Sequence, residues 1–133
     1  MIRLIRIFLT IETLLFAFAA SAHFSLVGDR GDPAAGGFET LIAIALAAGL
    51  VTSFIQPQAT LIAARVSQGF ALILTLVGFT LVLTVGPTTT FDVTMHLTML
   101  ATLVAGLVVT TRAAGGRNKD ADLPGIVRSA RCP

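Results

Sequence analysis

The sequence of 133 residues contains no tyrosine, no tryptophan and only one cysteine, Cys132. Without Tyr and Trp it lacks the aromatic belt that usually marks the two surfaces of a membrane protein. A single cysteine cannot form a disulfide within the chain, and the absence of a Cys-x-x-Cys pair excludes quinone-linked thiol oxidoreductases. Charged residues make up only 12% of the chain, against about a quarter in soluble domains. An ordinary soluble fold is therefore disfavoured.

The motifs of common soluble enzymes are missing as well. The sequence contains no phosphate-binding loop, no His-Glu-x-x-His pair and no Ser-His-Asp spacing suited to catalysis. We therefore predict that the chain is not an enzyme on its own.

Long apolar runs dominate what is present, and hydrophobic residues make up 55% of the chain. The runs occupy residues 4–27, 38–55, 60–85 and 91–111. A helix needs roughly 20 apolar residues to cross a ~30 Å hydrocarbon core. We predict an all-α membrane protein whose four transmembrane helices lie within residues 1–114. Residues 115–133 are polar and are predicted to be a disordered cytoplasmic tail.

The connections between the runs are short, so sequential helices should be antiparallel neighbours in an up-down-up-down bundle. Gly28–Gly37 is predicted to be an outer loop and Gln56-Pro57-Gln58 a tight cytoplasmic turn, while Gly86-Pro87 ends the third helix.

Basic residues gather on one side of this bundle, at Arg3, Arg6, Arg65, Arg112, Arg117, Lys119, Arg128 and Arg131. The other side carries Arg30 beside Asp29, Asp32 and Glu39. This asymmetry follows the positive-inside rule and places both termini in the cytoplasm. It also accounts for the isoelectric point of about 9.5, so we predict the lipid bilayer, and not nucleic acid, as a partner. The predicted location is the bacterial inner membrane, which the chain crosses several times.

The start of the chain allows a second interpretation, as a signal peptide. Arg3 and Arg6 precede an apolar stretch, and Ala20-Ser21-Ala22 has the form of a cleavage site. Cleavage there would leave His23 as a metal-chelating N-terminus. The apolar stretch is long for a signal peptide and Glu12 interrupts it, so we expect an uncleaved first transmembrane helix.

Ionisable residues inside membrane spans are costly and normally face protein or water. Glu12 is expected ~12 Å deep in the first span, and Arg65 and Gln68 roughly 9 and 13 Å deep from the same side in the third. The simplest interpretation is a buried structural pair of Glu12 with Arg65 or Gln68. The alternative is that Glu12 is a carboxylate that binds and releases protons.

The two histidines form a second group, near the outer ends of the first and fourth spans. Glu39 and Asp92 are predicted at the same level, and Asp92 and His96 are i,i+4 neighbours that can hydrogen-bond. In an up-down bundle the first and fourth helices are adjacent, so His23 and His96 could meet. Three sites are compatible with this pairing: a metal site with a carboxylate, a bis-histidine haem b, or an outward-facing polar pocket. Otherwise both imidazoles lie among lipid headgroups and water.

Small residues spaced four apart favour close helix packing in membranes. Such pairs occur at Ala43/Ala47 and Ala45/Gly49 in the second span, and at Ala101/Ala105 beside Thr94, Thr98 and Thr102 in the fourth. We expect each of these strips of small residues, here called seams, to pack against another helix of the same chain. The alternative is an interface with a partner subunit or a second copy.

Three stretches carry a family resemblance: Arg3 with Arg6, the segment from Glu12 to His23, and the run from Gly86-Pro87 through His96-Leu97-Thr98-Met99-Leu100 to Gly106-Leu107. In these the chain resembles small four-helix bacterial inner-membrane proteins of the DoxX-like and related uncharacterised families. The resemblance is one of architecture and extends over all four spans. It implies an integral membrane protein without catalytic residues. We therefore predict an accessory or scaffold subunit of a membrane complex, or a small homo-oligomer.

Glu12 gives a second resemblance, to the small multidrug resistance transporters. These have four helices and a glutamate in the first helix that binds protons and cationic drugs. The resemblance implies a proton-coupled transporter that uses Glu12. The sequence departs from this family because the aromatic residues of such drug sites are absent and Arg65 would neutralise the carboxylate. The transporter remains an alternative, as does a haem- or metal-binding protein that uses His23 and His96.

Overall fold

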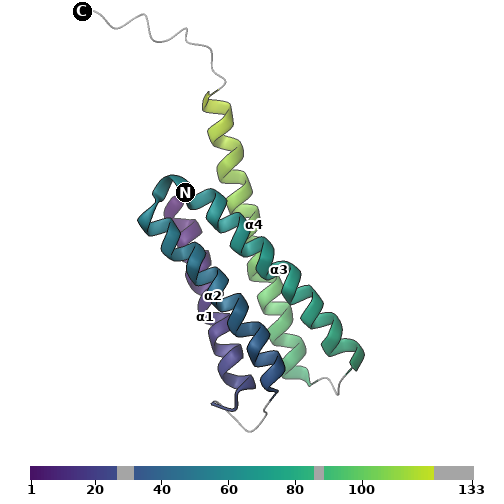
Figure 1. Ribbon diagram of the computed structural model, residues 1–133. Helices are drawn as coiled ribbons and strands as arrows, with labels where there is room; N and C mark the ends of the chain where they lie inside the picture. The colour runs from purple at the N-terminus through teal and green to yellow at the C-terminus, as the bar shows by residue number, and fades with distance from the viewer. Residues whose placement is uncertain (27–31, 86–88, 122–133) are drawn as a thin grey trace, which may run out of the picture.

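The computed structural model describes residues 1–26, 32–85 and 89–121, and the regular elements in these ranges are all helical (Figure 1). They are α1 (Ile2–His23), α2 (Pro33–Ile55), the short 3-10 helix η1 (Pro57–Ala59), α3 (Thr60–Val85) and α4 (Thr90–Ala121). Four stretches of 22, 23, 28 and 26 residues are long and apolar enough to cross a membrane. An all-helical protein with four candidate membrane spans is therefore confirmed.

The bounds of α3 agree with the sequence prediction, whereas α1 and α2 differ from it. α1 ends at His23 rather than at residue 27, because the chain turns at Phe24 and Ser25 has a φ of 57°. α2 begins at Pro33, inside the predicted loop 28–37. Asp32 explains this early start: its Oδ1 accepts hydrogen bonds from the backbone N–H groups of the first turn, and proline suits the first helical position.

The fourth helix is longer than its apolar run. α4 continues to Ala121, past the predicted span end at residue 111 and past residue 115, where a disordered tail was predicted to begin. A helix need not stop where hydrophobicity stops, because basic residues near its C-terminal end interact favourably with the helix dipole. The remainder of the predicted tail, residues 122–133, lies outside the described residues.

The long helices form a bundle in which each packs against the next and α4 also packs against α1. Fully buried apolar side chains from these helices make the core, namely Ile5, Leu9, Phe16, Leu46, Met99 and Leu103. Many large apolar side chains point outward instead, including Ile7, Leu14, Ile44, Ile62, Ile73 and Val104. An apolar surface of this kind suits contact with lipid and would be a liability in water.

The small-residue pairs have different positions in α2 and α4. Gly49 lies where α2 meets α3, and a Cβ at this position would collide with the side chain of Ser67. Ala43 is buried and Ala47 is half-buried on the same helix.

Ala101 and Ala105, in contrast, are exposed on the surface of α4, whereas packing within the chain was expected. The inner face of α4 is formed by Met99, Leu103 and Thr110, so the alanines point away from the bundle. Their use as an interface with another chain stays a prediction.

Candidate functional site

The first polar cluster lies inside the bundle and links three helices. Gln68 on α3 donates from Nε2 to both carboxylate oxygens of Glu12 on α1, at 3.0 Å each. The Thr110 hydroxyl on α4 lies 3.1 Å from Gln68 Oε1 and 2.9 Å from the Gly106 carbonyl, and can donate to either. Glu12, Gln68 and Thr110 are completely buried. The cluster therefore has its own internal partners and no exposure to solvent or lipid.

Gly106 makes room for this cluster. A Cβ at this position would collide with Glu12 Oε1 and Gln68 Nε2, so only glycine lets α4 pass the pair this closely. Neither Gly106 nor Thr110 was identified from the sequence as part of the cluster. The available signal was their spacing of four, which places them on one face of a helix.

The two arginines considered in the sequence have different places in the structure. Arg65, an alternative partner for Glu12, is exposed and takes no part in the buried cluster. Arg6 lies across the start of α1 and the end of α2. Its Nε donates to Ser53 Oγ at 3.3 Å, its Nη2 donates to the Ser53 carbonyl, and its guanidinium carbon lies 4.2 Å from the centre of the Phe54 ring. The sequence had given Arg6 only a topological role.

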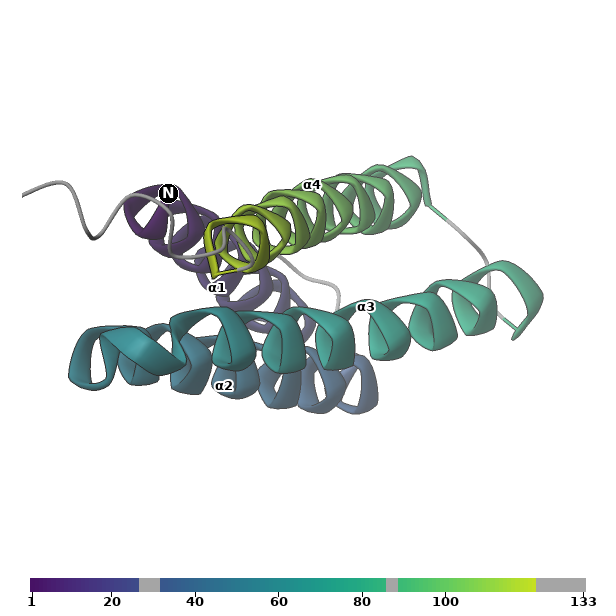
Figure 2. The same ribbon diagram turned by 90° about the horizontal axis from the view of Figure 1, so that it is seen from above.

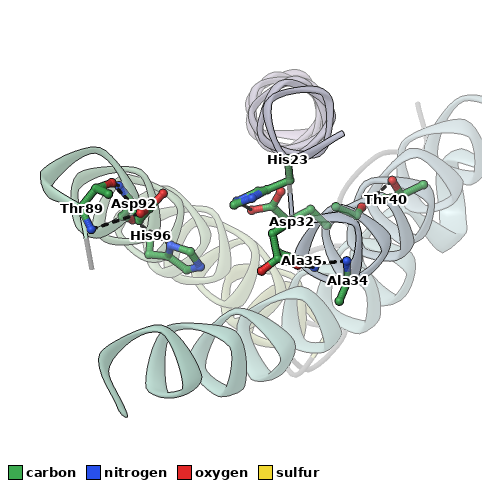
Figure 3. Close-up of polar contacts among 10 residues, drawn as sticks. His23, Asp32, Ala34, Ala35, Thr40, Thr89, Asp92 and His96 are labelled. Atoms are coloured by element: carbon green, nitrogen blue, oxygen red, sulfur yellow. Dashed lines mark hydrogen bonds and ion pairs between the residues drawn. The ribbon is translucent and has the colours of Figure 1, made fainter. Parts of the chain in front are cut away.

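The second polar cluster lines a pocket of about 630 Å³ at the end of the bundle where α1 ends and α2 and α4 begin. All four outer residues singled out from the sequence line this pocket: His23, Glu39, Asp92 and His96. Figure 3 shows His23 and His96 extending from α1 and α4 toward the space between the helices. Helices α3 and α4 separate toward this end (Figure 2), and both contribute to the lining.

The two histidines have different environments within the pocket. His23 Nε2 lies 3.6 Å from Glu39 Oε1. His96 is 8% exposed, its ring is stacked on Phe79 at 5.5 Å between ring centres, and its Nδ1 lies 2.8 Å from the Asp92 carbonyl oxygen. A carbonyl only accepts, so Nδ1 must carry the hydrogen, which leaves Nε2 as an acceptor in the neutral ring. His96 therefore faces the bundle rather than the headgroups.

Two of the pocket carboxylates cap helices. Asp32 caps α2, with Oδ1 at 3.1 and 3.2 Å from the N–H groups of Ala34 and Ala35. Asp92 Oδ2 accepts from the hydroxyl and the N–H of Thr89 at 2.5 and 3.2 Å, and Thr89 Oγ1 accepts from the Asp92 N–H in return. This is a reciprocal capping arrangement at the start of α4. Both carboxylates thus have local structural partners.

Glu39 is the exception. It is only 6% exposed, and its Oε2 has no hydrogen-bond partner among the described residues. A buried polar atom without a partner loses its hydration without compensation, at a cost of roughly 1–3 kcal/mol. Glu39 lies too far along α2 to cap that helix, so no local backbone group relieves this cost. Its free oxygen marks a position where a donor from outside the chain would fit.

The pocket does not assemble the metal site considered in the sequence. In the part of the chain that the structure describes, no three His, Cys, Asp or Glu residues lie close enough to hold a metal ion. His23 is paired with Glu39, and His96 with Phe79 and the Asp92 carbonyl. The bis-histidine haem stays a prediction. What the residues do form is the polar pocket.

No family model, no curated protein and no solved structure matches this chain. The resemblance to DoxX-like proteins therefore stays a prediction.

Proposed function

We propose that this chain is a multi-pass membrane protein that binds a small molecule in the pocket beside Glu39. The observation that carries the proposal is the buried Glu39 Oε2, which has no partner among the described residues and lies at the wall of a sizeable pocket. A ligand with a hydrogen-bond donor would satisfy this atom, and the free energy regained would contribute to binding.

The size and lining of the pocket support this proposal. Small-molecule sites commonly have volumes of about 300–1,000 Å³, with apolar walls and a few polar groups that fix orientation. Here the volume is about 630 Å³ and the apolar walls come from all four long helices, including Phe16, Ile42, Leu74 and Met99. Phe38, Val77 and Leu81 also line it and are exposed on the apolar surface, so the pocket is open toward lipid.

The orientation in the membrane is part of the proposal. The positive-inside rule, applied to Arg3, Arg6 and Arg112, favours both termini in the cytoplasm of a bacterium and an up-down-up-down bundle. Asp32, Glu39 and Asp92 lie at the other end. The pocket would then open at the outer half of the inner membrane.

A role as a subunit or homo-oligomer is the second candidate, and the exposed seam on α4 favours it. Ala101 and Ala105 lie on the surface beside Thr94 and Thr98. Small residues on an exposed membrane helix allow another helix to approach closely. This role is compatible with ligand binding, because none of these four residues lines the pocket.

The transporter hypothesis based on Glu12 receives less support. Glu12 does not line the pocket, and both of its oxygens accept from Gln68. We assign Glu12 to stabilisation of the bundle.

The test uses full-length protein in a non-ionic detergent and three probes with the same apolar body: 1-naphthylmethylamine, 1-naphthylmethanol and 1-naphthoate. Because the chain lacks Tyr and Trp, the naphthalene fluorescence is free of background from those residues. Protein-free micelles supply the blank for partitioning into detergent.

Two glycines on α3 provide a matched pair of variants. Gly78 lines the pocket, and its Cβ position has room, with His96 Nε2 4.0 Å away. Gly69 faces open space outside the pocket. We expect saturable binding of at least one probe to the wild type and Gly69→Leu, and at least ~10-fold weaker binding to Gly78→Leu. The proposal is overturned if no probe binds saturably, or if Gly78→Leu binds like Gly69→Leu.

A further inference from the structure

The charges of the pocket are unbalanced. Three carboxylates line it, from Asp32, Glu39 and Asp92, and none of the described lining residues is a lysine or arginine. The remaining titratable side chains of the lining are His23 and His96. Asp32 and Asp92 already accept hydrogen bonds at helix starts, so they act on a ligand mainly through charge. An anionic ligand would be repelled, and a cationic one attracted.

Two polar atoms of the pocket that are free to bind a ligand, on Glu39 and His96, are both hydrogen-bond acceptors. Glu39 Oε2 can only accept when the carboxylate is ionised, and His96 Nε2 is an acceptor because Nδ1–H donates to the Asp92 carbonyl. Figure 3 places His96 on the side of the pocket opposite α2, the helix that carries Glu39. The complementary ligand group is therefore one with several hydrogen-bond donors.

These two features select an amine over an alcohol or an amide. A protonated amine combines positive charge with two or three N–H donors, and charge-assisted hydrogen bonds to carboxylates are about twice as strong as neutral ones. The low dielectric of an apolar pocket strengthens the interaction further. The rest of the ligand must be apolar, because it would contact Ile42, Leu74 and Met99.

We infer that the ligand of this pocket is a lipophilic primary or secondary amine whose nitrogen donates to Glu39 and whose apolar part lies between α3 and α4. The inference rests on the proposed function and names the chemical class of its ligand. The opening beside Phe38, Val77 and Leu81 suits a molecule that partitions into the bilayer before it enters.

The experiment compares four probes at neutral pH on the same full-length protein: 1-naphthylmethylamine, its trimethylammonium analogue, 1-naphthylmethanol and 1-naphthoate. We expect the amine to bind at least ~10-fold more tightly than the alcohol, and naphthoate to bind weakest. The trimethylammonium compound keeps the charge and lacks N–H donors, so it should bind more weakly than the amine.

Glu39→Gln provides the residue-level test, because it removes the charge and keeps the shape. It should weaken amine binding by ~10-fold or more and change alcohol binding by less than ~3-fold. Glu39→Asp keeps the charge and should retain the preference for the amine. Helical circular dichroism confirms that each variant is folded before binding is measured.

The outcomes separate the inference from the proposed function. Saturable binding that Gly78→Leu abolishes, with the alcohol or naphthoate as tight as the amine, overturns the inference and leaves the proposed function standing. Amine binding that is unchanged in folded Glu39→Gln or equalled by the trimethylammonium compound also overturns it. Absence of saturable binding by all four probes overturns both.

Discussion

Glu12 and Glu39 are both buried glutamates in the same small bundle, yet their surroundings are opposite. Glu12 has both oxygens hydrogen-bonded to Gln68, Gln68 in turn can accept from Thr110, and Gly106 leaves room for the pair. Glu39 faces a pocket, and one of its oxygens has no partner in the part of the chain that the structure describes. A fully satisfied buried polar group stabilises a fold, whereas an unsatisfied one costs stability and is retained where it serves another purpose.

Burial alone does not identify a functional carboxylate. Glu12 is the more deeply buried of the two, and the sequence resemblance to multidrug transporters draws attention to it. The unused hydrogen-bonding capacity lies at Glu39 instead. Variants of the two glutamates and their neighbours should therefore separate into those that change stability and those that change binding.

The largest effect is expected at Gly106. Gly106→Leu would force a side chain into Glu12 and Gln68, so it should both overpack the core and break their hydrogen bonds. We expect a loss of about 3 kcal/mol or more in the free energy of unfolding, or failure to fold. The measurement is denaturant unfolding in mixed micelles, followed by helical circular dichroism. Gly69→Leu on α3, which faces open space, is the control. Equal stability of the two variants would contradict the close packing around Gly106.

Removing the donor of the buried cluster should have the next largest effect. Gln68→Ala leaves the Glu12 carboxylate without its partner and opens a cavity, at a cost of about 2–3 kcal/mol. The double variant Glu12→Ala/Gln68→Ala removes both groups and should lose less than the sum of the two single variants. Additive losses would mean that Glu12 and Gln68 are not coupled.

Several parts of this arrangement could be predicted from the sequence. The depth of Glu12 and Gln68 follows from the helical rise, and the four outer residues follow from their positions at the span ends. Arg65 shows the limit of this reasoning. Arg65 and Gln68 are three residues apart, a spacing that places both on one face of a helix. Yet Gln68 is completely buried and Arg65 is exposed. Which of the two faces Glu12 depends on how α3 is rotated against α1.

Other features depend on contacts between segments that are distant in the sequence. The collision of a Cβ at Gly106 with Glu12 and Gln68 involves three helices, and no pattern within α4 reveals it. The free oxygen of Glu39 is likewise a property of what surrounds it. The early start of α2 could have been predicted from the sequence, because Asp32-Pro33 is a favourable helix start. The glycines within Gly28–Gly37 favoured the prediction of a loop instead.

Substitution of Glu39 should change ligand binding and leave stability nearly unaffected, the opposite of what is expected at Gln68. Glu39→Gln removes a buried carboxylate that lacks a full set of partners, so the free energy of unfolding should stay within about 1 kcal/mol of the wild type or rise. The same unfolding experiment in mixed micelles checks this. A loss as large as that of Gln68→Ala would mean that Glu39 stabilises the fold, and would remove the contrast between the two glutamates.

The smallest effect on stability is expected at the exposed seam of α4. Ala105→Leu should change the free energy of unfolding by less than about 0.5 kcal/mol, because Ala105 is exposed on the surface of α4. If the seam is an interface between copies, the larger side chain should still abolish self-association, because it keeps the helices apart. Energy transfer between dyes on the single cysteine, Cys132, in lipid vesicles measures this. Val108→Leu, at an exposed position that is already large, is the matched control. Equal energy transfer in the two variants would place any contact between copies elsewhere.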